Sequence, residues 1–157
     1  HCLNVALLSI STGISLALSE QKIHDLGMAG LLHDIGKMLI PVEILNKPGK
    51  LTNEEFEIIK THPENAVKKL KNLVSYDVLS GIENHHEKLD GTGYPYGKTD
   101  SNIHYYGKVL SVCDVYDALT SDRSYKKTSF PNEVIEYIMG CADKQFDYEI
   151  LKHFLMK

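Results

Sequence analysis

Apolar residues recur at helical spacing along almost the whole chain. No stretch alternates apolar and polar residues over enough positions to indicate a β-strand. The first apolar stretch has its members three or four residues apart, as on one face of an α-helix: Leu3, Ala6, Leu7, Ile10, Ile14 and Ala17. The pattern predicts an all-α domain, a bundle of about six to eight helices.

Capping residues and helix breakers indicate where the helices begin and end. Ser19 is a typical N-cap, Thr52 with Glu55 matches a capping box, and Pro63 breaks or kinks the run before it. Glycine and proline predict a turn at 42–46 and loops at 46–50 and 90–95. The expected helices cover roughly 3–18, 20–37, 52–61, 66–73, 76–87, 106–120, 132–141 and 147–154.

Length and charge limit the possible functions. The chain has 157 residues, enough for one domain over 1–157, and its 43% apolar and 24% charged content is ordinary for a globular protein. A formal net charge of −4 argues against binding a nucleic-acid polymer, which favours a basic surface. It does not exclude a small anionic substrate, because bound metal ions supply local positive charge.

The cysteines and the apolar stretches indicate a cytoplasmic protein without a membrane segment. The three cysteines are odd in number and form no CxxC pair, so free thiols in a reducing compartment are the expected state. The longest apolar stretch, Val5 to Leu18, is interrupted by polar residues and too short to span a membrane. The chain begins at His1 with no methionine, which indicates a domain cut from a longer protein.

Histidine and aspartate occur in two adjacent pairs inside longer runs, HDIGK at 33–37 and HHEKLDGTGYP at 85–95. Imidazole and carboxylate without thiolate suit iron, manganese or similar divalent ions. Asp114 belongs to a helix with an apolar face, where a bare carboxylate is costly to bury. Taken together, these residues predict a metal centre, because a packed core would leave several polar groups without partners.

The spacing of neighbouring residues suggests roles around such a centre. Asp34 has two oxygens and can bridge two ions. Lys37 lies three residues later on the same helix face, where it suits an anion such as phosphate between itself and the metals. Arg123 follows nine residues after Asp114 and is a candidate for gripping a phosphate.

Other polar residues have ordinary interpretations. Asp117 is placed to support the site from behind the ligands, but for Asp117 and Glu87 we slightly favour plain charges on a helix face. His24, His104 and His153 fit no pattern and are expected at the surface or at helix caps.

These motifs resemble the HD-GYP domain, a branch of the HD phosphohydrolase superfamily. His33-Asp34 matches the HD, and Gly93-Tyr94-Pro95 matches the GYP. Further runs similar to the family cover essentially the whole chain: HCLNVA at 1–6, HPEN at 62–65, DVYDALTSDRSY at 114–125 and QFD at 145–147.

The resemblance implies a bacterial phosphodiesterase that hydrolyses cyclic di-GMP to pGpG or GMP with two or three metal ions, often iron or manganese. Asp34 would bridge the ions, and a hydroxide that they share would attack phosphorus. Lys37, Arg123 and Lys126 match positions that contact substrate phosphate, and Tyr94 matches the tyrosine near the substrate. Matched position by position, the metal ligands would be His1, His33, Asp34, His62, His85, His86 and Asp114.

The sequence leaves several points open. A third metal in some members uses a glutamate that would lie before residue 1. The substrate could instead be another cyclic dinucleotide such as cyclic GMP-AMP, because the metal ligands would be the same. A non-catalytic binding module and a general HD nucleotidase are further alternatives, which the filled ligand positions and the intact GYP segment disfavour. An upstream sensory or receiver domain is expected, and a homodimer is possible.

Overall fold

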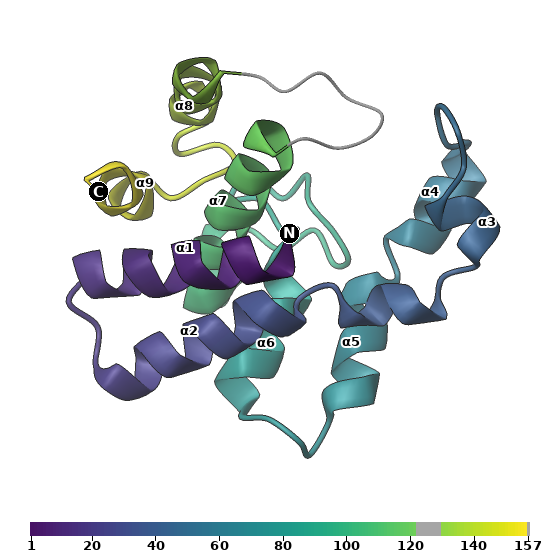
Figure 1. Ribbon diagram of the computed structural model, residues 1–157, viewed down its shortest axis with the longest axis horizontal. Coiled ribbons are helices and arrows are strands. Elements are labelled where there is room, and N and C mark those ends of the chain that lie inside the picture. The colour runs from purple at the N-terminus through teal and green to yellow at the C-terminus, as the bar shows by residue number, and fades with distance from the viewer. Residues whose placement is uncertain (122–129, 157) are drawn as a thin grey trace.

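The computed structural model describes residues 1–121 and 130–156, and the regular structure in this part is helical, without β-strands (Figure 1). No helix within it is both long enough and apolar enough to cross a membrane. The all-α prediction is confirmed. In chain order the elements are α1 (Cys2–Ser15), α2 (Glu20–Leu32), the 3-10 helix η1 (Ile35–Leu39), α3 (Val42–Leu45), α4 (Asn53–Ile59), α5 (His62–Leu70), α6 (Tyr76–Asn84), the 3-10 helix η2 (Asp100–Asn102), α7 (Tyr105–Thr120), α8 (Pro131–Gly140) and α9 (Tyr148–Leu155).

Most helix starts follow the predicted caps. The Thr52 hydroxyl accepts from the Glu55 amide at 3.2 Å while the Glu55 carboxylate accepts from the Thr52 amide at 2.8 Å, which is the expected capping box. The second predicted helix was too long, because α2 ends at Leu32 and the chain turns at His33-Asp34 into η1. The helix predicted over 76–87 likewise ends at Asn84. Both adjacent pairs of candidate ligands therefore lie just beyond helix ends, not inside helices.

Helix α7 forms the centre of the core. It packs against α1, α2, α6, α8 and α9, and its residues Val109 to Cys113 are almost entirely buried. Asp114 and Asp117 lie on this helix at the edge of the core. Burial of the surrounding apolar side chains supplies the main favourable term in folding and holds these carboxylates in place.

Helices α1 and α2 lie side by side in opposite directions, as Figure 1 shows. A Cβ atom at Gly30 would lie 2.8 Å from the Cα of Ala6, so only glycine permits this close approach. The N-terminus of α1, with His1 as its N-cap, consequently meets the C-terminal end of α2, where His33 lies.

Gly36 controls a second close approach. A Cβ atom there would lie 1.8 Å from the carbonyl oxygen of His62 and 2.6 Å from the amide nitrogen of Ala66. Backbone atoms cannot move aside as the end of a flexible side chain can. The contact between η1 and the first turn of α5 brings Asp34 beside His62.

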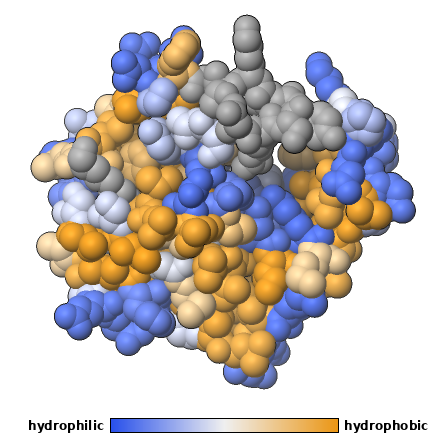
Figure 2. Space-filling view, in the orientation of Figure 1, coloured by the Kyte–Doolittle hydropathy of each residue, from blue (hydrophilic) through white to orange (hydrophobic). Residues whose placement is uncertain are grey.

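Helices α3 and α4, with the loop between them, form an arm over residues 42–59 that extends from the body of the domain (Figure 1). Figure 2 shows apolar residues on the arm next to a hydrophilic area in the middle of this face. The single-turn α3 falls where the sequence predicts a turn.

We expect Gly36→Ala to destabilise the fold, since the added methyl group would overlap the backbone of α5. Overpacking of this kind costs about 1–3 kcal/mol, which lowers the midpoint of thermal unfolding by several degrees in a domain of this size. Gly140→Ala is the matched control, because a Cβ atom at Gly140 meets no other atom within 4 Å. Equal melting temperatures for the two variants would contradict the interpretation.

Candidate metal centre

Five histidines gather where the ends of α1, α2 and α6 meet the start of α5. His33, His62 and His85 are almost entirely buried. Their rings lie edge to face, with centroids 5.1 Å apart for His33 and His85 and 5.4 Å for His62 and His85. His1 contacts the ring of His33, and His86 contacts those of His62 and His85.

Helix-end carbonyls orient the three buried histidines. The Nδ1 atom of each lies close to the carbonyl oxygen three residues earlier: Gly30 for His33 at 2.7 Å, Ile59 for His62 at 2.8 Å and Ile82 for His85 at 2.5 Å. The last carbonyls of a helix have no partner within it. A carbonyl oxygen only accepts, so each Nδ1 carries the proton and each Nε2 keeps its lone pair.

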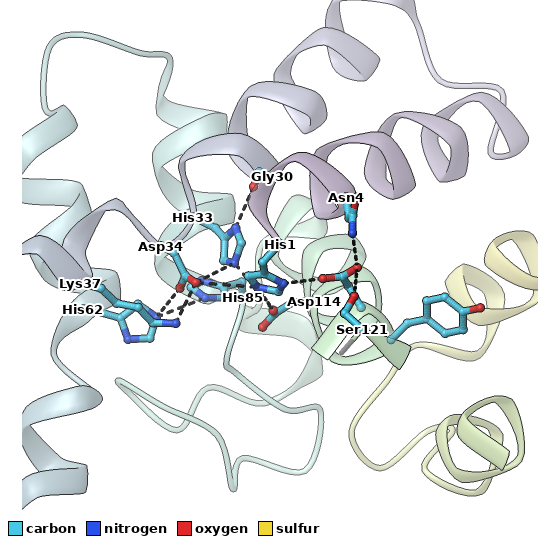
Figure 3. A network of polar contacts seen from close by, with 12 residues as sticks. His1, Asn4, Gly30, His33, Asp34, Lys37, His62, His85, Asp114 and Ser121 are labelled. Carbon is cyan, nitrogen blue, oxygen red and sulfur yellow. Dashed lines mark hydrogen bonds and ion pairs between the residues drawn. The ribbon is translucent and has the colours of Figure 1, made fainter. Parts of the chain in front are cut away.

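These Nε2 atoms converge without a donor between them. The Nε2 atoms of His62 and His85 are 3.4 Å apart, and the Nε2 of His33 makes no hydrogen bond among the described residues (Figure 3). Two neutral imidazoles that both present lone pairs repel each other, and a cation relieves this. The 3.4 Å separation is that of adjacent ligands on one ion with metal–nitrogen bonds of about 2.1 Å.

Asp34 lies between two groups of histidines. Its Oδ1 is 3.5 Å from the Nε2 of His62 and makes no hydrogen bond in the described part of the chain. Its Oδ2 is 3.5 Å from the Nε2 of His33 and 3.8 Å from that of His1. One oxygen therefore faces each side, the geometry expected of a bridging carboxylate. Three overlapping groups have ligand atoms within 4.8 Å of one another: His62, His85 and His86; His1, His33 and Asp34; His33, His85 and Asp114.

Asp117 orients His1. Its Oδ2 is 2.6 Å from the Nδ1 of His1, and its Oδ1 accepts from Asn4 and from Ser121, each at 2.9 Å (Figure 3). The other ring nitrogen of His1 is 2.9 Å from Asp114. Our preference for Asp117 as a plain helix-face charge was wrong: it is 4% exposed and holds the ring of a candidate ligand, as carboxylates behind metal-bound histidines do.

The protonation states suit metal binding. Burial lowers the pKa of His85 to about 3, and burial together with repulsion from His85 lowers the pKa of His86 as well. Burial would raise the pKa of Asp34, but His33 and Lys37 outweigh it and hold that pKa below its ordinary value. Near neutral pH the centre therefore offers neutral His85 and His86 rings and ionised carboxylates, the forms that bind metal ions. The cluster is suited to divalent ions.

Lys37 lies at the open edge of the centre. Its Nζ is 2.8 Å from Asp34 Oδ2, so the two residues share one face as predicted, although the segment is a 3-10 helix. The Lys37 side chain is about one third exposed, unlike the buried histidines. An ammonium group in this position meets whatever anion reaches the centre from solvent.

Tyr94 of the GYP segment packs on the centre. Its ring stacks on His86 with centroids 4.6 Å apart, and its amide donates to the His86 carbonyl at 3.1 Å. Burial, with Asp114 and Asp34 nearby, raises the pKa of Tyr94, so the hydroxyl keeps its proton.

The segment that carries Tyr94 is held by Glu87. The carboxylate of Glu87 accepts from the amides of Tyr96 at 2.8 Å and of Lys98 at 2.9 Å. The interpretation of Glu87 as a plain helix-face charge was wrong as well, since it is 2% exposed and lies beyond the end of α6. A hydrogen bond from a side chain to a later loop leaves no periodic signal in the sequence. Only the position of Glu87 inside the run at 85–95 hinted at this role.

The structure brings all seven predicted ligands together, and their binding of metal ions stays a prediction. Arg123 and Lys126 lie outside the described residues. Two of the minor predictions agree with the structure: the His104 ring caps α7, and His24 is exposed at the surface. His153 differs, since it is half-buried within α9 and its Nδ1 lies 3.2 Å from the Ser15 hydroxyl.

A family model described as HD domain matches residues 4–150 of the chain. The chain belongs to the HD-domain family. The predicted HD-GYP branch is confirmed by relatives that match nearly the whole of this chain. A cyclic di-GMP phosphodiesterase of Pseudomonas aeruginosa is 43% identical over 99% of this HD domain and 38% of the relative. The cyclic di-GMP phosphodiesterase response regulator RpfG of Xanthomonas campestris pv. campestris is 36% identical over 84% of this domain and 36% of the relative.

A relative with another named substrate is also similar to this HD domain. The 3'3'-cGAMP-specific phosphodiesterase 1 of Vibrio cholerae is 37% identical over 86% of the domain and 32% of the relative. The domain thus spans well under half the length of the curated relatives that it matches.

Solved structures agree with the fold. An HDGYP protein from Bdellovibrio bacteriovorus has a TM-score of 0.79 at 23% identity, covering 98% of this HD domain and 50% of that chain. A cyclic GMP-AMP-specific phosphodiesterase from V. cholerae has a TM-score of 0.77 at 21% identity, covering 99% of the domain and 43% of that chain. The helical HD-domain fold is therefore shared.

We expect Asp117→Asn to weaken metal binding by roughly 10- to 100-fold, because the ring of His1 loses the charged partner that orients it. A chelator competition with Mn²⁺ measures the affinity. Asp77→Asn is the matched control, since Asp77 also contacts a histidine, His104, at 3.1 Å but at the opposite end of α6. The role of Asp117 is refuted if its variant binds as tightly as the control.

The metal-free protein should lose stability as the pH falls below 6.5. The pKa of His85 is about 3 in the folded chain and 6.5 when unfolded, so between these values the unfolded state binds more protons and acid favours it. One such histidine costs about 2 kcal/mol at pH 5. Thermal unfolding in chelator from pH 8 to pH 4 measures the slope. His85→Gln should flatten it and His24→Gln should leave it unchanged, whereas equal slopes in the two would argue against the neutral state of His85.

Proposed function

We propose that this HD domain is a metal-dependent phosphodiesterase that hydrolyses cyclic di-GMP to pGpG or GMP. The observation that carries the proposal is the meeting of the His62 and His85 Nε2 atoms at 3.4 Å, with both protons on the far side of the rings. A non-catalytic module has no need to bury such a repulsion beside two ionised carboxylates.

The candidate ligands lie on both sides of Asp34, with His62 near its Oδ1 and His33 and His1 near its Oδ2, which suits a pair of iron or manganese ions. A pair of divalent ions bound here lowers the pKa of water and offsets charge on phosphoryl oxygens. His33, His62 and His85 present their Nε2 atoms while backbone carbonyls hold their Nδ1 atoms, so little reorganisation is needed on binding. His86 and Asp114 complete the candidate ligands.

Other residues of this chain act on the substrate. Lys37 is placed to donate to a non-bridging phosphate oxygen at the open edge of the centre, which orients the phosphate and stabilises developing charge. Tyr94 offers a neutral hydroxyl beside the centre, and its ring covers one face of His86. The roles of Arg123 and Lys126 at the phosphate stay predictions from the motif.

Cyclic GMP-AMP is the alternative substrate. The relatives include proteins named for cyclic di-GMP and proteins named for 3'3'-cGAMP. The 43% identity to the Pseudomonas aeruginosa cyclic di-GMP phosphodiesterase, above the 37% to the cGAMP-specific phosphodiesterase 1, favours cyclic di-GMP here. The cytoplasmic location, the upstream sensory or receiver domain, the homodimer and the third metal stay predictions.

We expect Asp34→Ala to abolish hydrolysis and to lower the metal content, because the bridge between the ligands on its two sides is gone. Lys37→Ala should keep the metals and lower kcat by roughly 10²-fold, as loss of one charge-stabilising donor does. The two variants therefore separate metal binding from catalysis. Metals per chain are counted by emission spectroscopy on anaerobically purified protein, and pGpG and GMP are measured by chromatography.

Lys152→Ala is the control for Lys37, since Lys152 also pairs with a carboxylate three residues earlier but on α9. A protein extended upstream of His1 tests whether a third ion binds. Full activity and two metals in Asp34→Ala would refute the proposed function, and hydrolysis of cyclic GMP-AMP alone would replace the substrate.

A further inference from the structure

A hollow of about 470 Å³ opens between η1 and the arm, next to the metal centre. This volume lies in the range of small-molecule binding sites. Its walls are mostly apolar, with two lysines among the described residues that line it: Ile44, Leu45, Leu51, Phe56, Lys37 and Lys47.

Two side-chain contacts connect the hollow to the metal centre. Lys37 belongs to both, since it lines the hollow while its Nζ lies 2.8 Å from Asp34. Phe56, on the wall, meets the ring of Tyr94 edge-on at 6.2 Å, and Tyr94 stacks on His86. A phosphate bound at the metal centre beside Lys37 would therefore lie at the entrance of this mostly apolar hollow.

Apolar side chains in this hollow face solvent. Leu45 is 39% exposed and Phe56 is 45% exposed. A flat aromatic ring covers such a surface well, and nucleobases stack on aromatic side chains in many nucleotide sites. A nucleotide has this combination of a phosphate with a flat ring one sugar away.

We propose that the hollow is a base subsite, in which one nucleobase of the cyclic dinucleotide packs against Phe56 and α3 while the attached phosphate lies at the metal centre. The inference rests on the proposed function. It adds the residues that recognise the part of the substrate that does not react, which none of the metal ligands can do.

Lys47 gives the subsite a preference for guanine. Its Nζ lies 2.6 Å from Glu55, whose carboxylate also accepts from the Thr52 amide, so the ammonium is held at the edge of the hollow. Lysine donates to the O6 and N7 atoms of guanine, whereas adenine has an amino donor in place of O6.

The test compares two ligands that differ only by the base. Calorimetry on the Mn²⁺-loaded protein gives the affinities for GMP and for ribose 5-phosphate. Phe56→Ala should weaken GMP binding roughly tenfold and leave ribose 5-phosphate unchanged, and Phe56→Trp should restore GMP binding. Ile58→Ala is the matched control, since Ile58 is similarly exposed on α4 but does not line the hollow.

Two further variants keep the test independent of Phe56, which also touches Tyr94. Leu51→Trp should fill the hollow and raise the KM for cyclic di-GMP without lowering kcat. Lys47→Met should reduce the preference for GMP over AMP.

The outcomes separate the subsite from the proposed function. Hydrolysis of cyclic di-GMP together with unchanged GMP affinity in the Phe56→Ala and Leu51→Trp proteins would overturn the subsite alone. Base-dependent GMP binding that Phe56→Ala weakens, without any hydrolysis, would support the subsite and overturn the phosphodiesterase. A wild-type protein that binds neither ligand would overturn both.

Discussion

The meeting of three buried imidazoles at the ends of helices is the interaction on which the rest of the structure depends. Each Nδ1 is tied to a carbonyl that its helix leaves free, so each Nε2 must point at the others. Their lone pairs and the unpaired Oδ1 of Asp34 make the centre unfavourable without a cation and favourable with one. Metal binding and folding are therefore expected to stabilise each other.

Around this centre the negative charges are mostly buried and the positive charge of Lys37 lies at the edge that faces solvent. Asp34 and Asp114 lie inside and stay ionised, Asp117 lies behind His1, and Lys37 lies at the edge. The chain as a whole carries a net charge of −4. A cyclic dinucleotide, the proposed substrate, is also anionic, so its binding would rely on bound metal ions and on the lysine at the edge, where local charge outweighs the global sign.

Selectivity among dinucleotides has to come from residues beyond the ligands. The same ligand set serves any phosphodiester, and the named substrates of the relatives differ. Two segments lie next to the centre. The buried Glu87 holds the GYP segment, and Phe56 of the arm contacts Tyr94 of that segment. The side chains of the arm that line the hollow are mostly apolar, unlike the metal ligands. In the proposed function, the reaction would occur at the helix ends and the base would be recognised on the arm.

The sequence by itself determined the helical class, most helix starts and the candidate ligands. Caps such as Thr52 with Glu55 and the apolar spacing of α1 depend on neighbours within one turn, so they can be recognised locally. The family resemblance rests in the same way on short runs of residues such as HDIGK and GYP. These signals located every candidate ligand before any fold was known.

Only the tertiary structure decided how those ligands meet and what supports them. The missing side chain of Gly36 lets η1 touch α5, a contact that no local pattern records. Asp117 reaches His1 across 116 residues of sequence, and Glu87 binds a loop after its own helix has ended. The hollow likewise exists only between η1 and the arm. Such pairings depend on packing between elements, and helical periodicity describes each element separately.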